Sequence, residues 1–223
     1  MRVWNVVAVT IAGGTAVPIW LHHRVHGIIS PHQAGLAFFV WLNAIIALWE
    51  ICLFLRIDLI EQQHRRFIAE YRGRELDRTK EFFAMRVPLN RLLSPTLWAE
   101  IWSTYSIFDD SYADRKSFGF FVDISNGFTT LIPSLLFLYG MTFELMPARA
   151  LGIIGLLLFY QTWYGTLVYF WSFLLNKRYV GHTRRNLALF VGMSNGLWFT
   201  FPLWGMYAAV VMIEKNTYDI FLH

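Results

Sequence analysis

The stretch that decides the fold is MSNGLWFTFP, residues 193–202, near the C-terminal end of the chain. It lies inside an apolar run from about residue 187 to residue 212, which is long enough to cross a bilayer. Asn195 and Trp198 are three residues apart, so they share one face of a helix. An amide that faced lipid would lack hydrogen-bond partners, so this face is predicted to line a protein interior or an intramembrane cavity.

The composition extends this membrane character to the whole chain. Of its 223 residues, 56% are hydrophobic and only 15% are charged, and its mean hydropathy is +0.42. Soluble domains carry about 25% charged residues. The net charge of +4 is small and dispersed, which argues against nucleic-acid binding. The single cysteine, Cys52, excludes an intramolecular disulfide framework. We therefore predict a polytopic membrane protein.

Five apolar segments have the length of a spanning helix, roughly 20 residues. They cover about residues 3–21, 33–55, 118–141, 150–174 and 187–212. The first lacks the small-residue cleavage site of a secretory signal and is predicted to be a retained span. The predicted fold class is an all-α integral membrane protein. It is a five-transmembrane-helix bundle forming one domain over residues 1–223, with an amphipathic, charged connection (56–116) between spans two and three.

The basic residues are distributed unevenly between the two sides of the membrane. All but Arg24, Arg149 and Lys215 of the 19 lysines and arginines fall on the side of the N-terminus. The short loop over residues 177–185 shows the same bias. Because cytoplasmic loops are enriched in lysine and arginine, we predict a cytoplasmic N-terminus and an exoplasmic C-terminus. The membrane would be that of the endoplasmic reticulum in a eukaryote and the cytoplasmic membrane in a bacterium.

Only two of the fifteen acidic residues, Glu50 and Asp123, fall well inside predicted spans. A charged carboxylate there is unfavourable by about 3 kcal/mol even on lenient scales, which makes it a candidate functional group. The alternative is a protonated carboxyl group hydrogen-bonded to a neighbouring helix.

Other spans place polar groups at a similar depth. Counting 1.5 Å per residue from the nearest basic residue puts Glu50, Asp123, Tyr169 and Asn195 about 9 to 15 Å inside the N-terminal side. Asn126 lies on the face of Asp123. This convergence predicts a polar cluster at the end of an apolar pocket, although independent helix–helix hydrogen bonds could also produce it.

A pair of carboxyl groups beside an apolar ligand has a definite chemistry. One of two neighbouring buried carboxyl groups tends to hold a proton, which it can donate to an alkene while the other accepts a proton. The ring of Trp198 could stabilise the carbocation between these steps. We therefore predict catalytic roles for Asp123 and Glu50 in isomerising or cyclising an isoprenoid or sterol-like lipid. The chain has no nucleophile elbow, phosphate loop or dinucleotide fingerprint, and no cofactor is predicted.

Four histidines, His22, His23, His26 and His32, crowd the first predicted exoplasmic loop. The H-H-x-x-H spacing could hold a metal ion. No acidic or thiol companion lies nearby in sequence, and adjacent histidines point apart on a helix. An interfacial turn is the preferred interpretation, and no metal site is predicted.

Three stretches in order resemble the emopamil-binding protein family, the sterol Δ8-Δ7 isomerases and their relatives that share the EXPERA domain. The first is similar to W-x-x-Y-x-x-x-D-x-x-Y, and an acidic residue follows it in the next span. The second is similar to Y-G-D-x-x-Y-F, and the third to M-N-A-L-W-x-x-x-P with one additional residue. In this chain they consist of Trp102, Tyr105, Asp109 and Tyr112 with Asp123; Tyr164, Gly165, Tyr169 and Phe170; and Met193, Asn195, Leu197, Trp198 and Pro202. The resemblance covers residues 98–212 well and residues 35–55 weakly.

The resemblance implies a five-helix membrane fold that holds a sterol-like or amine ligand. Ile46 stands where the isomerases carry a histidine one turn before Glu50. Thr166 replaces the aspartate of Y-G-D, Asp123 replaces a glutamate, and the charged segment 56–95 has no counterpart. The residues predicted to bind the ligand are Asn195, Trp198, Tyr169, Tyr112, Asp109, Asn126, Tyr164 and Thr166.

Two functions remain open at this point. The first is an intramembrane isomerase or cyclase, which the two acids at one depth favour. The second is a non-catalytic lipid- or sterol-binding protein, or a subunit packed against membrane-protein partners or further copies of itself. The missing histidine favours this second function. The enzyme is the preferred hypothesis.

Overall fold

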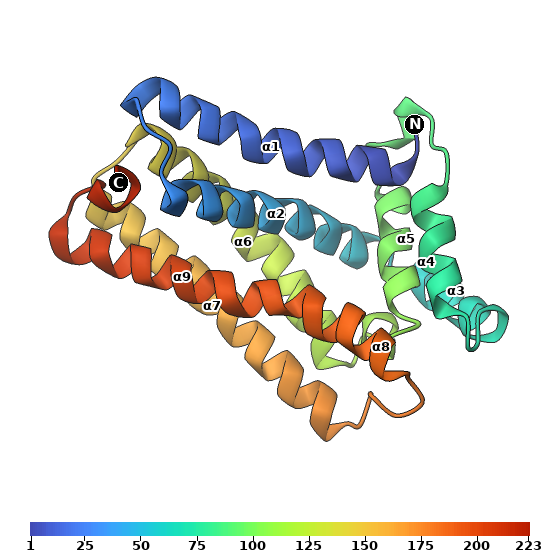
Figure 1. Ribbon diagram of the computed structural model, residues 1–223. Coiled ribbons are helices and arrows are strands. Elements are labelled where there is room, and N and C mark those ends of the chain that lie inside the picture. The colour runs from blue at the N-terminus through green and yellow to red at the C-terminus, as the bar shows by residue number, and fades with distance from the viewer. The chain divides into compact units, whose positions relative to one another are not determined.

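The computed structural model describes all 223 residues and contains helices but no β-strand. Four of its helices are long and apolar enough to cross a membrane: α1 (Val3–His26), α2 (Pro31–Leu55), α6 (Phe118–Phe143) and α7 (Ala148–Leu175) (Figure 1). A fifth such stretch, Arg184–Lys215, consists of α8 (Arg184–Asn186), the π-helical segment η3 (Leu187–Met193) and α9 (Ser194–Lys215). The predicted all-α class with five spans is confirmed, and the chain is a multi-pass membrane protein.

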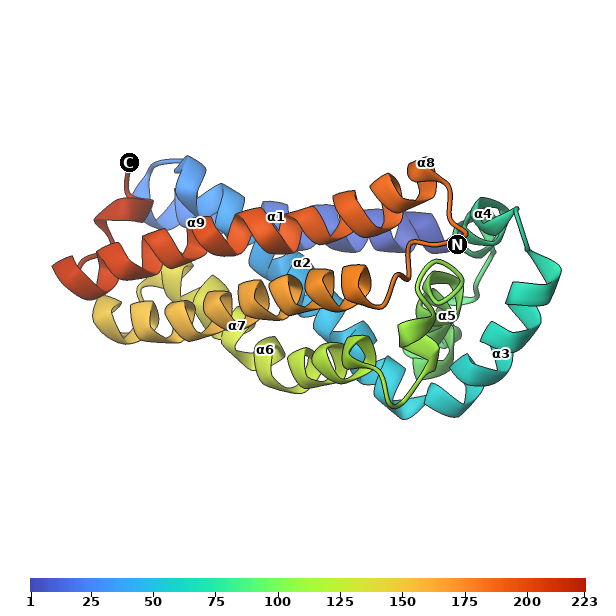
Figure 2. The same ribbon diagram turned by 90° about the horizontal axis from the view of Figure 1, so that it is seen from below.

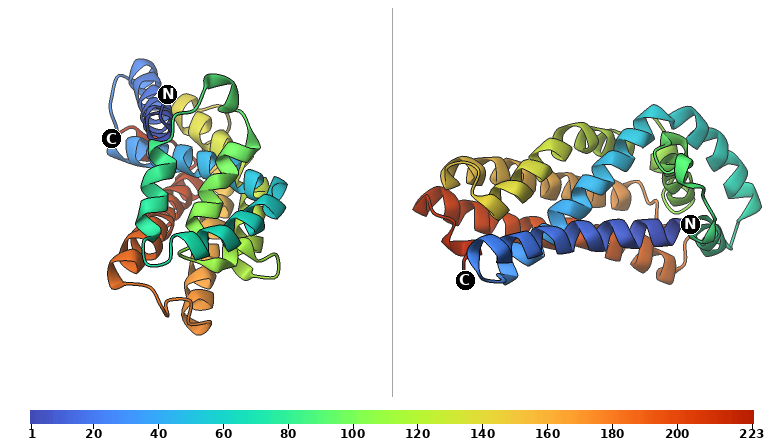
Figure 3. Two further views of the ribbon diagram at one scale, coloured as in Figure 1. Left: turned by 90° about the vertical axis from the view of Figure 1, so that its right-hand side faces the viewer. Right: turned by 90° about the horizontal axis from the view of Figure 1, so that it is seen from above.

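Spans two and three are joined by a chain of short helices. These are α3 (Ile57–Glu70), α4 (Glu75–Ala84), η1 (Leu89–Arg91), α5 (Pro95–Tyr105) and η2 (Asp110–Ala113). α3 and α4 are amphipathic, and each buries an apolar stripe that includes Ile60 and Phe67 on α3 and Phe82 on α4. Both helices pack against α5, as Figures 2 and 3 show. The charged connection therefore forms a packed helical layer on the N-terminal side of the spans.

Contacts along the chain divide it into two compact units. Unit 1 contains Met1–Ala8, Ala47–Phe128 and Leu167–Asn195, and unit 2 contains Val9–Ile46, Thr129–Thr166 and Gly196–His223. Each spanning stretch contributes to both units. Unit 1 contains the start of α1, the end of α2, the start of α6, the end of α7 and the start of the last spanning stretch.

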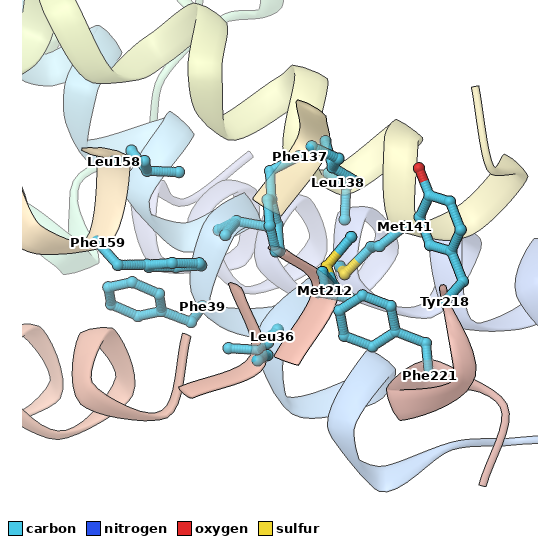
Figure 4. Close-up of a cluster of buried hydrophobic side chains, with 14 of the residues drawn as sticks. Leu36, Phe39, Phe137, Leu138, Met141, Leu158, Phe159, Met212, Tyr218 and Phe221 are labelled. Atoms are coloured by element: carbon cyan, nitrogen blue, oxygen red, sulfur yellow. The ribbon is translucent and has the colours of Figure 1, made fainter. Parts of the chain in front are cut away.

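The core of unit 2 is built from large apolar side chains of four spans (Figure 4). The ring centroid of Phe159, on α7, lies 6.2 Å from that of Phe39 and 5.0 Å from that of Phe137. A Cβ atom at Gly205 of α9 would lie 2.5 Å from the Phe159 ring, so glycine is what allows α9 to approach here. The short helix η4 (Asp219–Phe221) covers the cluster through the buried Phe221.

Candidate functional site

The two intramembrane carboxyl groups lie in unit 1 on neighbouring helices. Glu50 of α2 is only 5% exposed, and its carboxyl group interacts electrostatically with that of Asp123 on α6. The phenol of Tyr112, from η2, faces the Asp123 carboxyl group and interacts with it electrostatically. Asp123 itself is partly exposed. The site therefore contains one enclosed carboxyl group, one that is partly exposed, and a phenol that faces the second.

A glycine brings the two helices together at this level. Gly127 lies one turn after Asp123 on the same face of α6. A Cβ atom at Gly127 would lie 2.9 Å from the Cβ of Glu50, 3.0 Å from the carbonyl oxygen of Ala47 and 3.1 Å from the backbone nitrogen of Ile51. The backbone of α6 therefore rests directly on α2 beside Glu50, in the way that small residues allow between membrane helices.

We expect Gly127→Ala to lower the free energy of unfolding by about 1 to 3 kcal/mol, because the added methyl group meets backbone atoms that cannot move alone. The thermal unfolding midpoint of the purified protein in detergent measures this loss. Gly13→Ala on α1 is the matched control, because nothing lies within 4 Å of its added Cβ atom. An equal response of the two variants would contradict the close approach of α2 and α6.

A buried ion pair anchors the segment that carries Tyr112. Asp109 has a fully buried side chain, and that of Arg178 is 11% exposed. The Asp109 carboxylate accepts hydrogen bonds from Arg178 Nη1 at 2.8 Å, from the Tyr169 hydroxyl at 2.7 Å and from the Ser111 backbone N–H at 3.0 Å. These bonds join the α5–α6 connection to the end of α7. Asp109 and Tyr169, which were predicted to contact a ligand, are therefore hydrogen-bonded to each other.

Tyr105 forms hydrogen bonds with residues of the fifth span. Its hydroxyl donates to the Phe190 carbonyl at 2.7 Å and accepts from Asn195 Nδ2 at 3.4 Å, while Asn195 also donates to the Val191 carbonyl at 2.9 Å. Tyr105 also contacts Tyr169. Phe190 and Val191 belong to the π-helical segment η3, whose wider turn alters the register of the side chains that follow. No motif in the sequence indicated this π-helix.

Aromatic side chains from α5 and η2 line the same region. The ring of Tyr112 stacks on Trp102 with centroids 5.2 Å apart and meets Tyr105 edge-on at 5.0 Å. The indole N–H of Trp102 donates to the carbonyl of Trp49 at 2.6 Å, one residue before Glu50. The aromatic cluster thus holds Tyr112 beside the carboxyl pair.

The two tyrosines of this cluster stay protonated across the physiological range. Burial, and secondarily the charge of Asp109, raises the pKa of Tyr105 to about 12. Burial, and secondarily Asp123, raises the pKa of Tyr112 well above its ordinary value. Tyr112 therefore remains a neutral phenol, with a proton to donate, at neutral pH.

The raised pKa of Tyr105 predicts an alkaline loss of stability. Its folded-state pKa lies above the unfolded value of 10, so its contribution is fully present below pH 10 and is lost as the pH rises toward about 12. We expect the unfolding midpoint of the wild type to fall more steeply over this range than that of Tyr105→Phe. Parallel profiles for the two proteins would show that Tyr105 is not buried as described.

Three of the predicted ligand contacts lie in unit 2 instead. The indole N–H of Trp198 donates to Asn43 Oδ1 at 2.9 Å, and Asn43 in turn donates to Thr130 and Ser134. Tyr164 is exposed and stacks on Tyr160, and the Thr166 hydroxyl donates to the carbonyl of Thr162 at 2.9 Å. The remaining predicted residues, namely Glu50, Asp123, Asp109, Tyr112, Tyr169, Asn126 and Asn195, belong to unit 1.

The histidines near residue 22 are helical rather than part of a loop, because α1 continues to His26. His22 Nε2 donates to the carbonyl of Phe221 at 2.9 Å, and His26 Nε2 donates to the carbonyl of Thr142 at 3.1 Å. The tertiary structure also supplies the acidic companion absent from the local sequence, since Glu144 lies 3.8 Å from His26 Nδ1. No group of three potential ligands is arranged to hold a metal ion. These contacts attach α1 to the end of α6 and to the C-terminal turn.

The fold and the site together define a multi-pass membrane protein with a pair of carboxyl groups on adjacent spans. Comparison with protein-family models, with curated proteins and with solved structures finds no match to this chain. Its chemistry is therefore inferred from the side chains themselves.

Proposed function

We propose that this protein is an intramembrane enzyme that isomerises or cyclises an isoprenoid or sterol-like lipid by proton transfer at Glu50 and Asp123. The observation that supports this function is the placement of two carboxyl groups on helices that touch at Gly127, one turn from Asp123 and beside Glu50. Two negative charges on touching helices in an apolar medium are strongly unfavourable, so the pair shares one proton. An acid and a base are then available in one site.

The phenol of Tyr112, which faces Asp123 and not Glu50, distinguishes the two roles. A donor stabilises the charged form of a carboxyl group, so Asp123 acts as the base and Glu50 as the acid. Glu50 donates its proton to one carbon of an alkene, which leaves a cation on the other carbon. Asp123 removes a proton from an adjacent carbon, and the freed electron pair forms the new double bond. Return of the proton from Asp123 to Glu50 restores the starting state, so no external reductant or oxidant is needed.

The alternative function is a non-catalytic lipid-binding protein or a subunit of a membrane complex. It draws support from the polar groups that are already satisfied within the protein, notably Asp109, Tyr169 and Trp198. Side chains engaged in this way stabilise the fold without contacting a ligand. The carboxyl pair at Glu50 and Asp123 favours the enzyme, because a purely structural protein gains nothing from two adjacent acids in an apolar medium.

We also propose that unit 1 faces the cytoplasm. All the lysines and arginines assigned to the N-terminal side belong to this unit, including Lys177, Arg178, Arg184 and Arg185. The short loop that carries these four residues is the kind that governs orientation. Tags at each end, probed from either side of sealed vesicles, test this arrangement, and a cytoplasmic C-terminus would overturn it.

The enzyme proposal is tested by expression in a host followed by lipid extraction. Cells that carry the wild type are compared with cells that carry the Asp123→Asn/Glu50→Gln double variant and with cells that carry the empty vector. Membranes isolated from the three cultures are then incubated in deuterated water, which marks each carbon that the enzyme protonates, so the wild type is expected to produce a deuterated isomer that both other preparations lack. Identical isoprenoid and sterol profiles in all three cultures, with equal protein in the membrane, would reject the enzyme. A stoichiometric partner in a native pull-down would then support the subunit.

A further inference from the structure

Two adjoining clefts lie in unit 1, between the turn that joins α3 to α4 and the loop that joins α7 to α8. The larger has a volume of about 780 Å³ and combines apolar walls, including Ile68 and Val180, with Arg72 and Lys177. The smaller has a volume of about 470 Å³ and adds Arg74 and Arg185. Both clefts share Glu75 and His182. We call them together the basic cleft.

The basic cleft has an excess of unpaired positive charge. Two of its lining cations are neutralised, since Lys80 pairs with Asp77 and Arg178 with Asp109. The Glu75 carboxylate already accepts from the Gly73 N–H at 2.9 Å and from Asn186 Nδ2 at 3.5 Å. The other acidic residues of the lining are Asp110 and Asp77, the partner of Lys80. The cations that form no ion pair are Arg72, Arg74, Lys177 and Arg185.

The basic cleft also lies at the level of the membrane boundary. Helix α7 ends at Leu175, and the last spanning stretch begins at Arg184, so the loop between them is where the chain leaves and re-enters the hydrocarbon. Trp171 and Val180 are exposed on either side of this boundary, at 62% and 67%. Exposed tryptophan is typical of the headgroup region, where lipid phosphates are found.

We propose that the basic cleft binds the anionic headgroup of a membrane phospholipid. The phosphate contacts the unpaired basic groups, and an acyl chain lies along the exposed Ile68 and Val180. A basic pocket beside spanning helices is a recurrent means of holding such headgroups. This site lies on other residues than the carboxyl pair and depends only on membrane insertion, so it stands whether or not the protein is an enzyme.

The test uses the purified full-length protein in detergent, with bound lipid counted by native mass spectrometry. Phosphatidylglycerol is titrated against phosphatidylcholine with the same acyl chains. Each basic residue near an anionic lipid contributes roughly fivefold in affinity, so Arg72→Gln/Arg185→Gln is expected to bind phosphatidylglycerol roughly thirtyfold more weakly than the wild type. Binding of phosphatidylcholine should change little.

The matched control is Arg65→Gln/Arg91→Gln, which removes the same charge from exposed positions of unit 1 outside the basic cleft. It is expected to stay within about twofold of the wild type, as is usual for a distant surface charge. Lys177→Gln provides a second cleft variant if the double variant unfolds. An equal loss in the control, no preference for phosphatidylglycerol, or displacement of the lipid by millimolar inorganic phosphate would each overturn the proposal.

Discussion

Asp123→Asn is expected to lower the rate of lipid isomerisation by about 10² to 10⁴-fold, the usual contribution of a general acid or base. The amide cannot take up the substrate proton, although its shape and its contact with Tyr112 are largely kept. Glu50→Gln is expected to lose a similar factor, because it removes the proton donor of the same pair. The double variant should be hardly worse than either single variant, since residues that act as a unit are not additive.

Tyr112→Phe should have a smaller effect than either carboxyl variant. It removes the hydroxyl group that faces Asp123, and a hydrogen bond to a charged group contributes about 1.5 to 3 kcal/mol, or roughly 10- to 150-fold in rate. Rates are measured as product formed per amount of protein in isolated membranes. Glu214→Gln is the control, because it removes an exposed carboxylate near the end of α9 and should leave the rate unchanged. Near wild-type rates in both Asp123→Asn and Glu50→Gln would reject proton transfer at this pair.

Asp109→Ala is expected to be strongly destabilising, by about 3 to 5 kcal/mol, the cost of leaving a buried charge without its partner. The fully buried Asp109 carboxylate satisfies Arg178, Tyr169 and the backbone of Ser111 at once. Tyr169→Phe removes only one of these bonds and should cost about 1 kcal/mol. The free energy of unfolding in detergent measures both changes.

The neighbouring residue provides the matched control for this prediction. Asp110 is exposed and forms no ion pair, so Asp110→Ala should change the free energy of unfolding by less than about 0.5 kcal/mol. Replacing both charged partners in Asp109→Leu/Arg178→Met should recover much of the loss, because no uncompensated charge then remains. Equal destabilisation by Asp109→Ala and Asp110→Ala would show that the buried ion pair does not hold this segment.

The five spans could be predicted from sequence because about 20 apolar residues in a row have few other stable arrangements. Each predicted span falls inside an observed spanning helix or stretch, and the differences lie at the ends. The first span continues to His26 rather than ending near residue 21, because His22 and His26 donate to carbonyl groups far along the chain. Partners so distant in sequence leave no local signal.

The candidate site likewise contains some residues that the sequence singles out and others that it does not. Glu50 and Asp123 could be singled out from sequence, since a carboxyl group inside an apolar run is costly wherever it lies. The partners of Asp109 could not, because Tyr169 and Arg178 follow it by 60 and 69 residues. Nor does the local sequence distinguish Gly127, which lets α6 rest on α2, from Gly13, where an added Cβ atom would meet nothing within 4 Å.

By itself, the sequence determined that this protein is an all-α membrane protein with five spans and two intramembrane acids. Hydropathy and the cost of a charge in lipid are properties of single residues and short runs. Only the tertiary structure decided that Tyr112 faces Asp123 and that Trp198 is hydrogen-bonded to Asn43. It also decided that the Asp109 carboxylate accepts hydrogen bonds from Tyr169 and Arg178. Each of these contacts depends on how helices distant in sequence pack against one another, which hydrophobic periodicity does not specify.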